Sequence, residues 1–342
     1  MPESPEVKLL TETIRQHLIG HQIVGAQIIN GKYLTKQKVP NWELFTSNLP
    51  LTILEIGSHG KFIYFRLDRG LSIGIGLGMV GTFNFMVSDK QNKIRLQLDN
   101  GQTLCYDDYR NFGNWVVFAN QTELDAKLRK LGPNILSDQP LDLQTVQAIY
   151  SRYNGQNICK VIMAQDIISG IGVYIKSEAL YREKVNPMAT LGSLGLEKFL
   201  SILQTARQFA IESYNLQRDS GISYRGYAVS SGDKDYMPIS KSKTLFLVYE
   251  QKYDPNGFLV QKIKTPDGRN TSYVPQIQIE GAVSSSVNVA CPPVVFPIPI
   301  TIVKPVMVNN DEIISDELID EVIEEPIIPA NLVIGNQDEI IE

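Results

Sequence analysis

The hydrophobic period of this chain changes three times, and these changes constrain the fold more than any other feature. Apolar residues at helical spacing run through residues 5–19, and Gly20 is a suitable stop. From about residue 22 to 118 they fall instead in short segments rich in β-branched and aromatic side chains, separated by turn sequences. One helix followed by evenly spaced strands predicts a β-sandwich or barrel with an N-terminal helix. The predicted strands are Ile23–Ile29, Lys61–Leu67, Leu71–Ile75, Lys93–Leu98 and Trp115–Phe118.

The helical period returns over residues 122–216, which predicts a helical region. A Ser- and Gly-rich stretch at 219–243 is predicted to be a mobile loop. Turn sequences with Pro and Gly then separate short strand candidates, which predicts a small antiparallel unit. The helix candidates are 142–153, 157–166, 173–184 and 195–215, and the strand candidates are Thr244–Tyr249, Leu259–Thr265 and Thr271–Ile279.

We therefore expect a multidomain chain of mixed α and β structure, because 342 residues exceed one typical core. Residues 1–120 are the expected β-sandwich domain, and 121–243 the expected helical domain with the mobile loop. Residues 244–282 are the expected small antiparallel unit. Residues 283–342 are Pro- and Val-rich and then acidic, and we expect them to be largely disordered.

The net charge of −5 hides two regions of opposite sign. From Pro305 to Glu342 there are eleven acidic residues and no Lys or Arg, so the preceding residues hold 26 acids against 32 bases. A mildly basic body is suited to bind a polyanion. The acidic tail is suited to compete with that polyanion, to keep the protein soluble or to bind other proteins.

Several classes of protein are disfavoured by the sequence. No apolar run reaches the roughly 18–20 residues of a membrane helix, and the N-terminus lacks the pattern of a secretory signal. The three cysteines, Cys105, Cys159 and Cys291, suggest neither a disulfide framework nor a metal site. We therefore expect an intracellular protein that does not bind membranes, with nucleus and cytoplasm both open.

The opening residues Met-Pro-Glu-Ser-Pro-Glu carry a possible chemistry. If Met1 is removed, Pro2 has a free secondary amine with a pKa near the α-amino range of roughly 7.7–8.0. Such an amine can attack a sugar C1′ and form an iminium, with Glu3 and Glu6 as carboxylates for proton transfer. The alternative is that Pro2 starts a helix and that the glutamates complement its dipole.

Four further segments have both a functional and a structural interpretation. Gly60-Lys61 opens a strand, and the glycines around Met79 allow close approach of a ligand or simply a tight corner. Arg110 and Phe112 can contact bases or form a surface cation–π pair. Ser169–Gly172 precedes a helix and offers backbone N–H groups to an anion such as a phosphate.

In this order and at these distances, the segments resemble the formamidopyrimidine-DNA glycosylase/endonuclease VIII family of base-excision repair enzymes. The resemblance covers roughly residues 1–280. Its motifs are Pro2-Glu3-x-Pro5-Glu6-Val7, Gly60-Lys61, Leu77-Gly78-Met79-x-Gly81, Asp108-x-Arg110-x-Phe112-Gly113, Leu131-Gly132-Pro133, Gly170-Ile171-Gly172-x-Tyr174-x-x-Ser177-Glu178-x-Leu180 and the Thr265–Gln278 hairpin with Gly268-Arg269-Asn270-Thr271.

The resemblance implies a bifunctional DNA glycosylase and abasic-site lyase that needs no cofactor. Pro2 is then the nucleophile, Glu3 the proton donor and acceptor, and Glu6 the residue that positions it. Lys61 and Arg269 are the implied phosphate-binding residues of the active site. The implied DNA-contacting residues are Met79, Arg110 and Phe112, which fill the gap left by the flipped base, and Gly170, Gly172 and Lys176 in a helix–two-turns–helix region.

Two departures from the family pattern bear on these expectations. The positions expected to hold four zinc-binding cysteines are Asn256, Leu259, Val274 and Ile277, so no thiolate is available there. The resemblance therefore points to the zincless-finger, endonuclease VIII-like branch. Val173 stands where an Asn usually binds a phosphate, which predicts weaker DNA binding or lower activity.

We thus expect a monomer that acts on damaged DNA, with duplex favoured over single strands. The alternative is a non-catalytic module that binds damaged DNA with the same fold. The preferred base is left open by the sequence.

Overall fold

The computed structural model describes residues 2–220 and 245–281, with only the backbone given for Ser220. All of these residues belong to one compact unit. The acidic tail and most of the predicted 219–243 loop lie outside the described residues. In the described part of the chain, no helix has both the length and the apolar character needed to cross a membrane.

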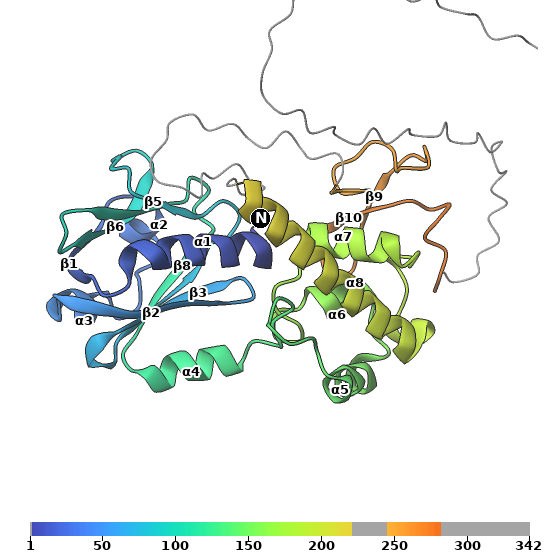
Figure 1. Cartoon of the computed structure of the whole chain (residues 1–342), viewed down its shortest axis with the longest axis horizontal. Helices are drawn as coiled ribbons and strands as arrows, with labels where there is room; N and C mark the ends of the chain where they lie inside the picture. Colours follow the sequence, from blue (N-terminus) through green and yellow to red (C-terminus); the bar gives the residue numbers. More distant parts are fainter. Residues whose placement is uncertain (1, 221–244, 282–342) are drawn as a thin grey trace, which may run out of the picture. The chain divides into compact units, whose positions relative to one another are not determined.

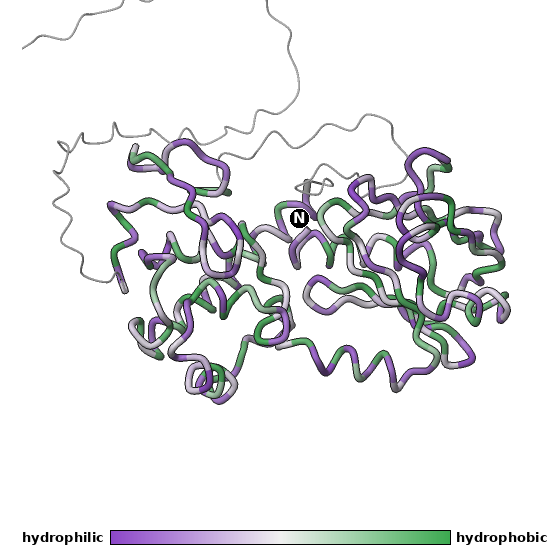
Figure 2. Tube along the Cα trace, turned by 180° about the vertical axis from the view of Figure 1, so that it is seen from behind, coloured by the Kyte–Doolittle hydropathy of each residue, from purple (hydrophilic) through white to green (hydrophobic). Residues whose placement is uncertain are grey.

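Eight strands form one antiparallel sheet in the order β5-β7-β6-β1-β2-β3-β4-β8 (Figure 1). Their alternating side chains place a continuous apolar set on the inner face, and hydrophobic and hydrophilic stretches alternate along the chain trace (Figure 2). The strands are β1 Gln22–Ile28, β2 Leu51–His59, β3 Phe62–Leu67, β4 Ser72–Gly76, β5 Thr82–Asn84, β6 Asn92–Leu98, β7 Thr103–Asp107 and β8 Asn114–Phe118.

Aromatic rings show that the two ends of this sheet face each other. Tyr106 on β7 and Trp115 on β8 have ring centroids 5.4 Å apart, although their strands lie near opposite ends of the sheet. Phe83 on β5 likewise contacts Phe65 on β3, at 6.1 Å. The sheet therefore folds back on itself, which confirms the predicted β-sandwich with an N-terminal helix.

Strands β2, β5 and β7 lie within the predicted strand region but were not among the segments named in it. In β2, a register shift between Ile53 and Glu55 breaks the two-residue alternation.

Three of the helices, α4, α5 and α6, begin where a side chain satisfies a first backbone donor. Asn120, Asp142 and Asn157 each accept a backbone N–H of the first turn of the helix that follows. The helices are α1 Ser4–Leu18, α2 Lys32–Thr35, α3 Trp42–Ser47, α4 Gln121–Arg129, α5 Leu143–Tyr153, α6 Ile158–Met163, α7 Val173–Arg182 and α8 Leu191–Ser220, with a 3₁₀ turn at Asp68–Gly70.

Helix α1 packs against β2 and α8, so it contacts both the sandwich and the helical region. Helix α8 has a kink at Gly195, whose φ is +82°, and this kink coincides with the predicted helix start at residue 195. A second apolar core lies among α5–α8, and a small third cluster lies beneath the last hairpin. The domain boundaries proposed from the sequence stay predictions.

The last hairpin pairs β9 (Gln261–Lys264) with β10 (Asn270–Tyr273). The predicted strand Thr271–Ile279 is wrong beyond Tyr273. There the Val274 N–H turns away to the Gln278 side chain, at 2.8 Å. The chain then forms a turn, because the Gln278 N–H donates to the Val274 carbonyl, at 2.9 Å.

The predicted strand Thr244–Tyr249 is also wrong over its described residues, 245–249. The backbone N–H groups of Leu247, Val248 and Tyr249 donate to the Glu178 carboxylate, at 3.0, 2.9 and 2.8 Å. A strand would need a neighbouring strand for these donors. The buried Glu178 carboxylate on α7 accepts these hydrogen bonds instead, so the segment turns around this side chain.

Replacing Glu178 with alanine is expected to lower the free energy of unfolding by roughly 3 kcal/mol, because three backbone donors lose a buried charged acceptor. Urea denaturation measures this change. The exposed Glu197→Ala on α8 is the control and should stay near the wild-type value. Equal stabilities of the two variants would contradict the organising role of Glu178.

Candidate active site

The Glu3 carboxylate lies at the N-terminus of α7, 170 residues away along the chain. It accepts the backbone N–H groups of Gly172 at 2.7 Å, Tyr174 at 2.9 Å and Ile175 at 3.3 Å. Orphan donors and the positive end of the helix dipole make this a suitable place for a carboxylate. The glycine is required, since a Cβ at Gly172 would lie 2.1 Å from the carboxyl carbon of Glu3.

The Glu6 carboxylate lies one helical turn further on and holds Glu3 in place. It accepts the Glu3 backbone N–H at 2.8 Å, the Tyr174 hydroxyl at 2.9 Å and the Gln217 amide at 2.7 Å. Helices α1, α7 and α8 therefore meet at this one side chain. Burial is the largest cause that raises the Glu6 pKa above its ordinary value.

Burial also raises the pKa of Glu3, to about 7, although the charge of Lys61 and the N–H of Tyr174 lower it. The pKa of Lys61, in the turn between β2 and β3, is lowered by burial, and the nearby charge of Arg269 lowers it further. The cations of Lys61 and Arg269 thus repel each other near the two buried carboxyl groups. A carboxyl group that titrates near neutral pH can both donate and accept a proton.

Pro2 precedes Glu3 directly and is buried, two residues before α1 begins at Ser4. The structure brings Glu3, Glu6, Lys61 and Arg269 into one electrostatic cluster, while Arg269 itself is exposed. In the described part of the chain, the Lys61 ammonium has no hydrogen-bond or ion-pair partner within 4 Å, and the charges of Glu3 and Glu6 act on it from further away. An anion bound nearby would stabilise its charged form.

The expectation that the Ser169–Gly172 turn offers free N–H groups to a DNA phosphate requires a correction. The Gly172 N–H binds Glu3, and the Gly170 N–H donates to the Gln165 side chain at 2.9 Å. The helix N-terminus does bind an anion, but this anion is the protein's own carboxylate.

The expectation that Lys176 contacts DNA is also corrected. Its side chain is fully buried, and its ammonium forms an ion pair with Asp267 at 2.7 Å. Periodicity could not reveal this, because α7 is covered on several sides.

The predicted gap-filling residues lie on two loops that pack backbone to backbone. A Cβ at Gly78 would lie 2.5 Å from the carbonyl carbon of Phe112, so only glycine allows this approach. Arg110 stacks over the Phe112 ring at 5.2 Å, and both side chains are exposed. Met79 is half-buried on the first loop. Whether these side chains enter DNA stays a prediction.

Sequence reasoning gave no role to Tyr174 and did not find Gln217. Tyr174 belongs to the motif at residues 170–180, but the sequence did not indicate that its hydroxyl contacts Glu6. Gln217 binds Glu6 across 211 residues of chain, and no sequence signal marks that contact.

The raised pKa of Glu3 predicts a pH-dependent penalty on stability. Between its ordinary pKa of 4.5 and about 7, the folded protein keeps a proton on Glu3 that the unfolded chain loses. Relative to Glu3→Gln, the wild type should therefore lose roughly 3 kcal/mol as pH rises through this range, with no further loss above it. Urea denaturation at a series of pH values tests this, and parallel curves for the two proteins would contradict it.

The fold and this cluster define a class of protein: a β-sandwich and a helical region, joined at a buried carboxylate beside an N-terminal proline. Residues 1–115 match the formamidopyrimidine-DNA glycosylase N-terminal domain. The formamidopyrimidine-DNA glycosylase of Shewanella sp. strain MR-4 is 28% identical over 240 residues, which cover 69% of this chain and 85% of that protein. The formamidopyrimidine-DNA glycosylase of Ureaplasma parvum is 26% identical over 290 residues, which cover 81% of this chain and 100% of that protein.

Solved structures show the same fold. The MutM (Fpg) protein of Thermus thermophilus gives a TM-score of 0.67 at 23% identity, covering 82% of this chain and 100% of that one. The Lactococcus lactis formamidopyrimidine-DNA glycosylase, bound non-covalently to DNA with an AP site, gives a TM-score of 0.65 at 19% identity. The match covers 81% of this chain and 99% of that one. The chain is thus similar to formamidopyrimidine-DNA glycosylases in sequence and in fold, and its residues 1–115 match the N-terminal domain of that family.

Proposed function

We propose that this protein is a DNA glycosylase of base-excision repair that also cleaves the DNA strand, with Pro2 as its nucleophile. The observation that carries the proposal is the Glu3 carboxyl group, adjacent to Pro2 and held by α7 with a pKa of about 7. The family relatives named as glycosylases support the first activity. The strand cleavage rests on the chemistry of a free N-terminal amine.

The proposed reaction starts on a nucleotide flipped out of the duplex. The Pro2 nitrogen forms a bond to C1′ while the bond from C1′ to the base breaks, and the base leaves with the proton that the amine nitrogen releases. Glu3 then protonates the sugar ring oxygen as the C1′–O4′ bond breaks, and the nitrogen lone pair completes the iminium.

The iminium makes the C2′ proton acidic. The Glu3 carboxylate accepts this proton, the 3′ phosphate leaves by β-elimination, and a second elimination releases the 5′ phosphate. Water finally hydrolyses the iminium and returns the free amine.

Lys61 and Arg269 are proposed to bind the phosphates that flank the flipped nucleotide. Their mutual repulsion favours an anion between them, because such an anion offsets both charges. Met79, Arg110 and Phe112 are proposed to fill the gap in the duplex. This filling role favours duplex DNA over single strands as the substrate of a monomeric enzyme.

The last hairpin is proposed to be a zincless finger. Among the described residues, no group of three or more His, Cys, Asp or Glu side chains is arranged to hold a metal ion. Two of the four positions expected for cysteine, Val274 and Ile277, belong instead to a small apolar cluster with Tyr181 and Val248. The residues present therefore do not fit a zinc ion.

The second candidate function is a non-catalytic module that binds damaged DNA. Val173 favours it, because this residue at the first position of α7 has no side-chain hydrogen-bond donor for a phosphate. Defined oxidised bases and abasic sites, in duplex and single-stranded oligonucleotides, distinguish the two functions. Base release with strand nicking supports the enzyme, whereas tight binding without either product would support the module.

A further inference from the structure

A buried ion pair joins the tip of the last hairpin to the middle of α7. The Lys176 ammonium lies 2.7 Å from the Asp267 carboxylate, and the two side chains are 0% and 4% exposed. Burying two charges is unfavourable unless they are paired and hydrogen-bonded. Asp267 lies in a turn, where an aspartate is usually solvated, so this burial needs an explanation.

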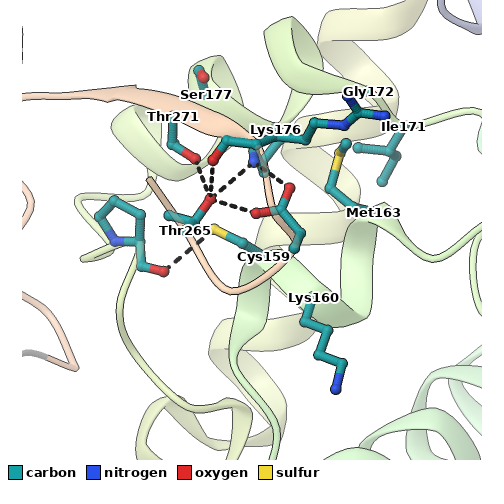
Figure 3. A network of polar contacts seen from close by, with 12 residues as sticks. Cys159, Lys160, Met163, Ile171, Gly172, Lys176, Ser177, Thr265 and Thr271 are labelled. Carbon is teal, nitrogen blue, oxygen red and sulfur yellow. Dashed lines mark hydrogen bonds and ion pairs between the residues drawn. The ribbon is translucent and has the colours of Figure 1, made fainter. Parts of the chain in front are cut away.

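The pair is completed by two threonine hydroxyls. The Thr265 hydroxyl accepts from the Lys176 ammonium at 3.3 Å and lies 2.8 Å from the Thr271 hydroxyl. It has one proton to give, and both the Asp267 carboxylate and the Arg269 carbonyl, at 3.0 Å, are within reach. Figure 3 shows Thr265 at the centre of this network.

The same network fixes the backbone on both sides of Arg269. The Thr265 N–H donates to the Arg269 carbonyl at 2.9 Å, and the Gly268 N–H donates to the Thr265 carbonyl at 2.9 Å. Gly268 has a φ of +77°, a conformation that closes the turn directly before Arg269. The Arg269 side chain remains exposed on this fixed backbone.

Helix α7 relates this turn to the acid/base residue. Glu3 binds the first turn of α7 through the N–H groups of Gly172 and Tyr174, and Lys176 follows on the next turn. One rigid helix therefore sets the position of both Glu3 and the Asp267 turn. The described residues contain no group of three or more His, Cys, Asp or Glu side chains that could hold a metal ion and do this instead.

We propose that Lys176 and Asp267, with Thr265, are positioning residues that hold Arg269 where it binds a DNA phosphate. This inference rests on the proposed function, in which Arg269 binds such a phosphate. A buried pair suits the task, because its two partners lock one register of the turn against α7.

The salt dependence of DNA binding tests this, with an uncleavable duplex that carries a tetrahydrofuran abasic analogue. Loss of one phosphate contact lowers the slope of log Kd against log salt concentration by about 0.9. Arg269→Ala should show that loss. Lys176→Met and Asp267→Asn should show the same loss, and neither should lower the slope further when combined with Arg269→Ala.

Two further variants keep the test decisive. Lys176→Met combined with Asp267→Leu leaves no unpaired buried charge, so it should fold and still show the lowered slope. Lys198→Met is the matched control, because it removes an ion pair to Glu280, at 3.0 Å, without touching the turn. It should keep the wild-type slope.

A wild-type slope in the Lys176 and Asp267 variants, or losses that add to that of Arg269→Ala, overturns the proposal. An unchanged slope in Arg269→Ala overturns the proposal as well, because Arg269 then makes no phosphate contact that the ion pair could position. Base release by the wild type is measured in parallel. Its absence overturns the proposed enzyme activity, while the slopes still decide the positioning role.

Discussion

A chain in which Pro2 stays inside a peptide bond is expected to form no borohydride-trapped complex with an abasic-site oligonucleotide. One lysine inserted between Met1 and Pro2 achieves this, because a bulky second residue keeps Met1 in place. The proline ring is retained, but its nitrogen becomes an amide whose lone pair is delocalised and cannot attack C1′. The wild type, with Met1 removed, should be trapped readily.

Trapping yield on a denaturing gel measures the effect, and mass spectrometry of both proteins reports the state of Met1. Pro2→Gly is the intermediate case, since it keeps a free N-terminal amine, now primary instead of secondary, but loses the fixed backbone angle of proline. It should be trapped more slowly than the wild type. Equal trapping of the extended and wild-type chains would remove Pro2 as the nucleophile, and a binding assay would then decide between another nucleophile and the non-catalytic module.

Replacing Glu3 with glutamine is expected to reduce base release by roughly 10²–10⁴-fold, the range for loss of a general acid–base group. The side chain keeps nearly the same shape, so DNA binding should change little. Single-turnover kinetics measure the chemical step, and binding to the tetrahydrofuran duplex measures affinity. Glu43→Gln, an exposed carboxylate on α3, is the matched control and should leave both unchanged.

The pH dependence of the reaction rate distinguishes a proton-donor role of Glu3 from a merely structural one. A proton donor with a pKa of about 7 is lost as pH rises, so the wild-type rate should fall on the alkaline side. The acidic limb should follow the free Pro2 amine, which attacks only when unprotonated. In Glu3→Gln the alkaline limb should disappear, and its persistence would assign that limb to another group.

Much of the fold follows from local patterns in the sequence. The helical stripe of residues 5–19 and the short β-branched strands predict α1 and the sandwich, because each element exposes one periodic apolar face. The turn sequence Pro266-Asp267-Gly268 likewise predicts the last hairpin, whose glycine has the required positive φ. The N-terminal hexapeptide identified Pro2, Glu3 and Glu6 as candidates for chemistry.

Tertiary structure decided what these side chains contact. Glu3 and Glu6 owe their raised pKa values to burial against α7 and α8, which the sequence separates from them by some 170 to 210 residues. The predicted strand at 244–249 failed because the Glu178 carboxylate replaces a neighbouring strand as the hydrogen-bond acceptor. Contacts of this kind leave no periodic trace in the sequence.

Lys176 shows the same division most clearly. By itself, the sequence determined a cation on a helix that follows a glycine-rich turn, and the family resemblance implied that this cation contacts DNA. The structure buries that cation against Asp267 of the hairpin and leaves Arg269 exposed. The physical reason is that a charge has the same local sequence signal whether it meets solvent, DNA or a buried counter-charge. Only the packing of distant segments selects among them.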